Sequence, residues 1–190
     1  MSAMSGLVHG IGILALIIVV LIVVLAVWFI STSNKFARKG VKIEEALSGI
    51  EVALTKRYDT LTKMAEVAKS YAKHELDTLT QVIQMRKGMS VEELTDSANQ
   101  MTRMEDRIHV LAEAYPELRS NTVYEELQKG IRDTEEQLQA ARRLYNANVS
   151  SFNQQLVVFP SSIVAGMKGL TKRAFFEAEE HKLKDVKLDL

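Results

Sequence analysis

Apolar residues form one unbroken run near the start of the chain and then recur at helical spacing. Between Ile11 and Ile30 no residue is charged, and only Gly12 lies outside the apolar set. A helix of this length spans roughly 30 Å, which matches the hydrocarbon layer of a bilayer. Only a helix satisfies its own backbone groups when a single segment crosses lipid. The pattern predicts a short N-terminus and a transmembrane anchor over 1–33, with its helix at about 11–30.

A cleaved signal peptide is the competing interpretation of this segment. It fits less well, because no Lys or Arg precedes Ile11 and the apolar run exceeds about 15 residues. The large residues Val27, Trp28 and Phe29 also stand where a cleavage site needs small ones. We therefore expect a retained anchor whose partner is the lipid bilayer.

The next segment, from Asn34 to Lys87, has no proline, and its apolar residues recur every three or four positions. Such a seam predicts a long amphipathic helix at about 35–87. Gly40 and Gly49 are weak points, since each glycine costs about 1 kcal/mol against alanine. Ser31 to Ser33 is the one place where continuity with the membrane helix could break.

A second helix is expected at about 91–114. Gly88 suits a left-handed helix end, and Ser90 with Glu93 has the spacing of a capping box. The helix should stop before Pro116. A joint of only two or three residues predicts that it folds back antiparallel on the first helix.

A third helix is expected at about 121–158. Thr122 and Glu125 repeat the capping-box spacing, and Pro160 ends the periodic pattern. The expected fold is all-α, an N-terminal transmembrane helix followed by a bundle of long antiparallel helices over 34–160. Residues 161–190 are expected to form a short helix and a charged tail.

Charge and cysteine content narrow the function classes. The chain has 24 basic and 24 acidic residues, and this neutrality argues against a nucleic-acid binder. The absence of cysteine excludes disulfides, thiolate metal sites and a cysteine nucleophile. Basic residues follow the apolar run closely, at Lys35, Arg38, Lys39 and Lys42. The positive-inside rule then places the C-terminal domain in the cytoplasm and the N-terminus outside the bacterial plasma membrane.

Charged residues also occupy seam positions of the predicted helices. These residues are Arg57, Glu75, Glu105, Glu135 and Arg142. Because buried charges are costly unless paired, we expect an ion network that fixes helix register.

A carboxylate metal site is the alternative for these residues. It would need Glu-x-x-His motifs, and the sequence has none; Asp106 with His109 is the nearest approach. We expect no cofactor, metal or catalytic site. Separately, the apolar and basic segment from Lys168 to Phe176 could lie on an anionic membrane surface or cap the end of the bundle.

Several short runs together resemble the bacterial LemA family. They are Glu113 to Leu118 with its Tyr115-Pro116 pair, Thr134-Glu135, Ala141 to Asn146 with Tyr145, His74-Glu75 and Phe159 to Ser161. The resemblance implies an N-terminally anchored helical bundle with its N-terminus outside, and a family without established catalytic residues. One departure is that Leu61 to Met64 lacks the proline usual in the family, so the resemblance does not carry over the kink that such a proline implies.

These observations favour a membrane-anchored interaction or scaffold protein that is not an enzyme. Its partners would be unidentified proteins or its own copies. A carboxylate-lined metal protein or enzyme, and a module that senses or shapes the membrane surface, are the alternatives.

Overall fold

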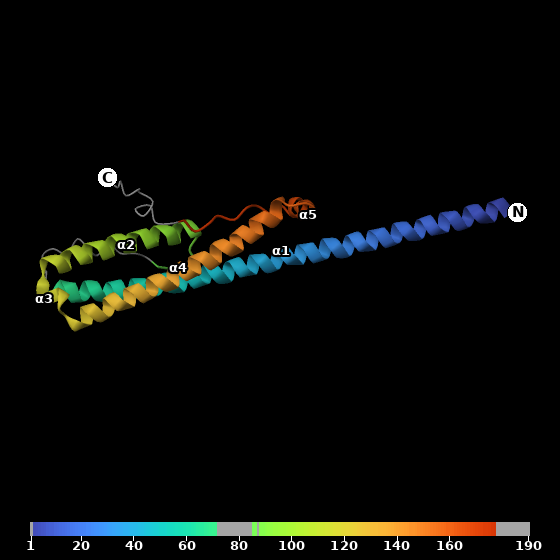
Figure 1. The fold of residues 1–190 in the computed structure, drawn as a ribbon. Coiled ribbons are helices and arrows are strands. Elements are labelled where there is room, and N and C mark those ends of the chain that lie inside the picture. Colours follow the sequence, from blue (N-terminus) through green and yellow to red (C-terminus); the bar gives the residue numbers. More distant parts are fainter. Residues whose placement is uncertain (1, 72–84, 87, 178–190) are drawn as a thin grey trace, which may run out of the picture. The chain divides into compact units, whose positions relative to one another are not determined.

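The structure is a computed structural model that describes residues 2–71, 85–86 and 88–177. In these residues it has five helices and no strand: α1 (Ser2–Tyr71), α2 (Val91–Ala114), α3 (Pro116–Arg119), α4 (Thr122–Val157) and α5 (Ser161–Met167) (Figure 1). The predicted all-α class is confirmed.

Helix α1 runs without interruption past each predicted weak point. It continues through Ser31 to Ser33 and through both Gly40 and Gly49. Gly49 lies at a helix contact, where a Cβ would meet that of Ala141 at 3.9 Å. Among the described residues, α1 is the helix that is long and apolar enough, by length and composition, to cross a membrane.

The predicted extent of the first helix to residue 87 is wrong at its end. Met85 and Arg86 are not helical. The backbone N–H of Arg86 contacts the Met89 sulfur at 3.4 Å, and Gly88 has φ +77°. This stretch is therefore a loop that leads into the start of α2.

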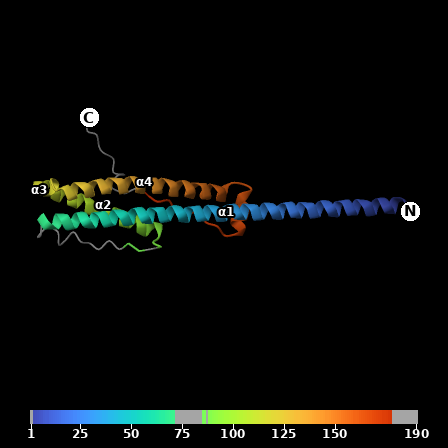
Figure 2. The ribbon, with the colours of Figure 1, turned by 90° about the horizontal axis from the view of Figure 1, so that it is seen from below.

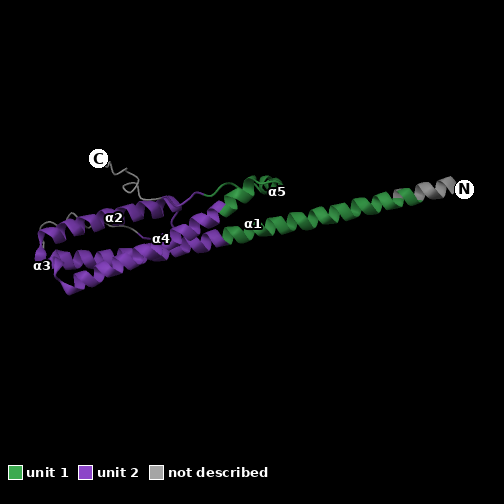
Figure 3. Ribbon diagram, in the orientation of Figure 1, with its two compact units in different colours: residues 1–41, 151–173 green, residues 42–150, 174–190 purple. Residues whose placement is uncertain are grey.

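The chain divides into two compact units (Figure 3). The membrane-side unit comprises residues 1–41 and 151–173, and the bundle unit comprises residues 42–150 and 174–190.

In the bundle unit, α4 runs antiparallel to α1, as Figures 1 and 2 show. Asn148 donates to the Lys42 carbonyl at 3.0 Å, and at the other end Asn121 donates to the Tyr71 hydroxyl at 2.9 Å. A Cβ added at Gly130 would lie 3.4 Å from the methyl carbon of Thr60. Residues farther along α1 therefore meet residues nearer the start of α4, as in an antiparallel pair.

Helix α2 runs parallel to α1, so the predicted antiparallel fold-back is wrong. The Gly88 N–H donates to Glu51 at 3.2 Å, and Arg57, farther along α1, reaches Glu105, farther along α2 (Figure 1). The prediction assumed a helix that continues to Lys87 and a joint of two or three residues. Met85 and Arg86 are not helical, so α2 does not follow directly on the end of a helix at Lys87. Residues 72–84 lie outside the described part of the chain.

The seams predicted from the apolar period form the core of the bundle unit. Its fully buried side chains include Ile50, Leu54, Leu61, Met64, Leu94, Met101, Ile108, Leu118, Tyr124, Leu138 and Val149. Burying one such aliphatic side chain contributes about 1.5–3 kcal/mol before entropy is counted. The alternation of three and four residues therefore predicts the inward faces correctly.

Two helix starts differ in how they are capped. The Ser90–Glu93 capping box is present in full at α2. At α4 the cap is Asn121, whose side-chain oxygen accepts from the N–H groups of Val123 at 2.9 Å and Tyr124 at 3.1 Å. The box expected from Thr122 and Glu125 is replaced by this cap, because Thr122 is itself the first residue of the helix.

The membrane-side unit joins the first part of α1 to the end of α4 and to α5. Phe36 and Phe152 meet edge to face with ring centroids 5.8 Å apart. Lys39 donates to the Ser151 hydroxyl at 2.6 Å, and Lys168 contacts the Ser33 hydroxyl. Asn153 pairs twice with the backbone of Arg173, at 2.9 Å in each direction. These contacts join the end of α4 and the residue after α5 to α1, and they join Arg173 to α4.

Candidate functional site

The centre of the bundle unit holds a buried arginine between two carboxylates. Arg57 of α1 is 3% exposed, and its Nη2 donates to Glu105 Oε2 of α2 at 2.9 Å. The same nitrogen lies 3.2 Å from the Thr102 hydroxyl. Arg57 Nη1 lies 3.3 Å from Glu135 Oε2 of α4. One guanidinium therefore links all three long helices.

Further polar groups surround the two carboxylates. Gln139 donates to Glu135 Oε1 at 2.8 Å, and His109 Nε2 lies 3.8 Å from Glu105 Oε1. The Tyr124 hydroxyl is fully buried and has no hydrogen-bond partner among the described residues. Burial raises the pKa of Tyr124 above its ordinary value of 10.0; the nearby Gln128 side chain opposes this increase, and the negative charge of Glu105 adds to it.

The structure brings together three of the five residues predicted to form an ion network: Arg57, Glu105 and Glu135. Arg142 is buried as well, but its guanidinium lies over the Phe176 ring, 4.9 Å from the centroid. Glu75 falls outside the described residues, as does the neighbouring His74. The cation–π contact of Arg142 could not be foreseen, because Phe176 belongs to a segment with no helical period.

The chemistry open to this cluster is limited by its pairing. Glu105 accepts a hydrogen bond from Arg57, Glu135 forms an ion pair with it, and an arginine does not act as a proton acceptor at neutral pH. Within the described ranges, no three His, Asp or Glu side chains converge in a way that could hold a metal ion. The cluster is suited to fixing the register of three helices.

The neighbouring residues Tyr145 and Asn146 of α4 hold the chain that follows α5. The Tyr145 hydroxyl donates to the Ala174 carbonyl at 3.0 Å. Asn146 donates to the Phe176 carbonyl at 3.0 Å and accepts from the Phe176 N–H at 2.8 Å. An asparagine amide thus pairs with a backbone as a neighbouring strand would. Sequence reasoning missed this role, and a buried-face asparagine in a long helix was the available signal.

The residues Glu113, Tyr115 and Pro116 lie at the corner between α2 and α3. The Tyr115 N–H donates to the Leu111 carbonyl at 3.1 Å and closes α2, and Pro116 is the first residue of α3. Proline is favoured there because its missing N–H would have no helical partner. Glu113 is exposed. This motif therefore terminates a helix.

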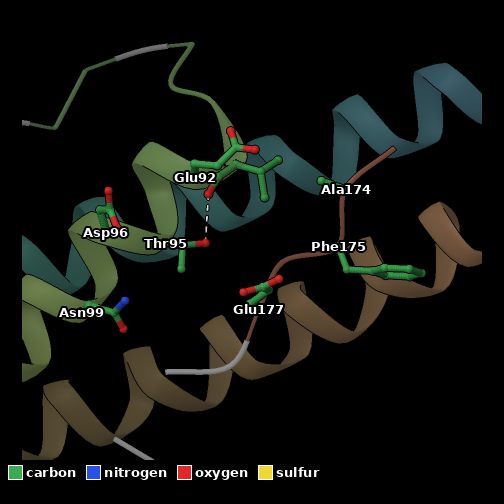
Figure 4. A pocket seen from close by; sticks show the side chains of 8 residues that line it. Glu92, Thr95, Asp96, Asn99, Ala174, Phe175 and Glu177 are labelled. Carbon is green, nitrogen blue, oxygen red and sulfur yellow. Dashed lines mark hydrogen bonds between the residues drawn. The ribbon is translucent and has the colours of Figure 1, made fainter. Parts of the chain in front are cut away.

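A small cavity of about 240 Å³ lies beside the first turns of α2 (Figure 4). Its lining consists of Val91, Glu92, Thr95, Asp96, Asn99, Ala174, Phe175 and Glu177. The Thr95 hydroxyl is occupied, since it donates to the Val91 carbonyl at 2.9 Å. Three carboxylates and no Lys or Arg occur among the described lining residues, so the cavity disfavours anions. It offers no nucleophile paired with a base.

A second, shallower groove of about 430 Å³ follows α1. Its lining consists of Ser48, Glu51, Val52, Thr55, Lys56, Met85 and Arg86. We call this surface the α1 groove. Val52 is 55% exposed there, next to charges of both signs. Such a mixed surface with an apolar centre is typical of protein contacts rather than of a catalytic cleft.

Comparison with known proteins gives two matches. The model of the LemA family matches residues 46–190. Protein LemA of Metamycoplasma hominis is 26% identical over 163 residues, which cover 83% of this chain and 74% of that protein. The family match includes the bundle helices and both motif regions described above.

Proposed function

The chain belongs to the LemA family, and we propose that it is a single-pass membrane protein whose helical bundle binds proteins without catalysing a reaction. The observation that carries the proposal is the composition of α1. One helix contains both the apolar segment at 12–30 and the seam that builds the bundle core.

The apolar segment supports a membrane location. Its Ile, Leu and Val side chains between Ile13 and Ile30 are 49–64% exposed, and no part of the most apolar stretch of α1 lies buried inside the protein. A continuous apolar surface of this length calls for a bilayer or another apolar partner. The basic residues after Ser33 favour an N-terminus outside the plasma membrane and a bundle in the cytoplasm.

The exposed α1 groove of the bundle supports a role in binding proteins. The α1 groove combines an exposed apolar residue with flanking Glu51, Lys56 and Arg86. The charged cluster around Arg57 is enclosed by its own pairs and serves the fold. A protein segment, from another protein or from a second copy of the chain, is the partner class that we assign to the groove.

Photocrosslinking in native membranes tests this proposal. A photoreactive amino acid at Val52 in the groove should give a crosslinked product of defined mass, and the same amino acid at Val110 on α2 is the matched control, since Val110 is 67% exposed. No product from Val52 contradicts the interaction role. A product from both positions in equal amount contradicts the assignment to the groove.

The competing function is a metal protein or enzyme that uses Glu75, Glu105 and Glu135. Elemental analysis of chain purified without chelator distinguishes the two. Stoichiometric metal that is lost in Glu105→Gln at unchanged melting temperature would replace the interaction proposal.

A further inference from the structure

We infer that the end of α4, the turn after it and α5 form a second membrane contact that rests on the anionic surface of the bilayer. We call residues 157–167 the interfacial foot. The inference rests on the proposed membrane crossing of α1 and adds a lipid-binding surface beside it.

The foot exposes large apolar side chains in a short stretch. Phe159 is 78% exposed, Met167 72% and Val157 63%, and Val158 and Ile163 are about half exposed. The other face of α5 is already used, because Val164 and Ala165 are buried. An apolar cluster of this density on a water-facing surface marks a contact with another apolar phase.

Contacts within the membrane-side unit place the foot at the level where α1 leaves the apolar segment. Phe152 packs on Phe36, and Lys168 contacts Ser33. The end of α4 continues from Phe152 toward earlier residues of α1, because Ser151 pairs with Lys39 and Phe152 with Phe36. Val157 lies five residues beyond Phe152, about 7.5 Å along the helix, which brings it level with Ser31 to Ser33.

The charge of the residues around the foot indicates that its partner is an anionic lipid surface. The membrane-side unit contains six basic residues, Lys35, Arg38, Lys39, Lys168, Lys172 and Arg173, and no Asp or Glu, although the whole chain has equal numbers of both signs. Exposed apolar residues flanked by basic ones are the combination that inserts into the headgroup region of anionic bilayers. Binding to a protein would not require that this unit contain no Asp or Glu, so the composition favours an anionic lipid surface as the partner.

The sequence pointed to a different membrane-facing segment, Lys168 to Phe176. Phe176 cannot contribute, because it is 3% exposed and lies against Arg142. The structure moves the apolar part of the contact to the foot and leaves the basic residues Lys168, Lys172 and Arg173 beside it.

The absence of native cysteine makes a direct test simple. The full chain is reconstituted in phosphatidylcholine vesicles containing phosphatidylglycerol, with one cysteine that carries an environment-sensitive dye. Phe159→Cys reports on the foot, Val20→Cys on the crossing helix and Val110→Cys on the bundle. Met167→Cys is a second reporter on the foot in case Phe159→Cys fails to fold.

Quenching by lipid-attached nitroxides is the measurement. At Phe159 and Met167 we expect blue-shifted emission and a loss of fluorescence several-fold greater than at Val110, strongest with headgroup-level quenchers. Quenching at Val20 without quenching at either foot position overturns the foot and leaves the membrane crossing intact. No quenching at Val20 overturns the membrane crossing itself.

A charge-reversed variant tests the electrostatic part. Lys35 and Lys172 are both exposed, so Lys35→Glu with Lys172→Glu changes the charge of the unit with little effect on packing. Quenching at Phe159 should fall in this variant, as it should in vesicles of phosphatidylcholine alone. Quenching that is unaffected by both changes contradicts an anionic lipid partner.

Discussion

Arg57 of α1 and Glu105 of α2 form an ion pair of 2.9 Å in the middle of the bundle unit. The pair joins two parallel helices, and the second carboxylate on Arg57, that of Glu135, adds the antiparallel one. Removing the arginine would take from each of these carboxylates the cation that it faces at the centre of the bundle unit.

We therefore expect Arg57→Met to lower the free energy of unfolding by about 3 kcal/mol, the lower end of the range for breaking a buried pair. The lower end applies because water reaches both carboxylates, which are 21% and 27% exposed. Urea unfolding of the full chain in detergent, followed by circular dichroism, measures the change. Lys56→Met, at the exposed neighbouring position, is the control and should cost less than about 1 kcal/mol. Equal losses in both variants would contradict a special role for Arg57.

A second prediction concerns Asn146, which makes two hydrogen bonds to the backbone of Phe176. Asn146→Ala should release residues 174–177 and speed hydrogen exchange at the Phe176 amide by about tenfold, the equivalent of one lost hydrogen bond. Asn148→Ala is the control, since Asn148 bonds instead to the Lys42 carbonyl. Unchanged exchange at Phe176 would show that the Tyr145 hydrogen bond and the cation–π contact with Arg142 hold this segment without Asn146.

The start of α2 should be sensitive to acid through Glu93. Its pKa is lowered, first by the Ser90 backbone N–H and then by the Arg86 side chain. A lowered pKa contributes stability above the ordinary value of 4.5 and loses it as the pH falls toward the folded-state pKa. Amide exchange over the first turn of α2 should therefore rise below about pH 4.5 in the natural chain and much less in Glu93→Gln. Glu92→Gln, one residue earlier, should behave like the natural chain.

The buried Tyr124 should make the fold sensitive to alkali. Its pKa is raised, so the stabilising effect of the neutral phenol is present below pH 10.0 and is lost as the pH rises through the folded-state value. Tyr124→Phe should leave stability at pH 7 within about 1 kcal/mol, because the hydroxyl has no partner among the described residues. Unfolding followed from about pH 9 to about pH 11 should then show a smaller loss than in the natural chain. A steeper loss in Tyr124→Phe would contradict this assignment.

The helical fold could be predicted from the sequence because its signals are local. The apolar period, the Ser90–Glu93 box and Pro116 fix where α2 lies, and the structure has Val91–Ala114. The direction of α2 was predicted wrongly, because the apolar period predicts a helix as far as Lys87, whereas Met85 and Arg86 are not helical. The partner of Arg142 was equally hidden, because Phe176 lies 34 positions away in an irregular segment.

Of the candidate sites, the charged cluster could be predicted from the sequence, and the interfacial foot could not. Seam positions identify Arg57, Glu105 and Glu135, because a charge on an apolar face stands out at helical spacing. The foot could not be recognised, since its apolar residues look like core until the fold shows that only Val164 and Ala165 are buried.

Thiol labelling of intact cells tests the central claim, that α1 crosses the membrane once and separates the N-terminus from the bundle. Single cysteines at Ser2 and at Ser120, in a chain that has none of its own, are exposed to a membrane-impermeant maleimide. We expect labelling of Ser2→Cys in intact cells, and labelling of Ser120→Cys only after the membrane is permeabilised. Labelling of both positions, or of Ser120→Cys alone, in intact cells would contradict it.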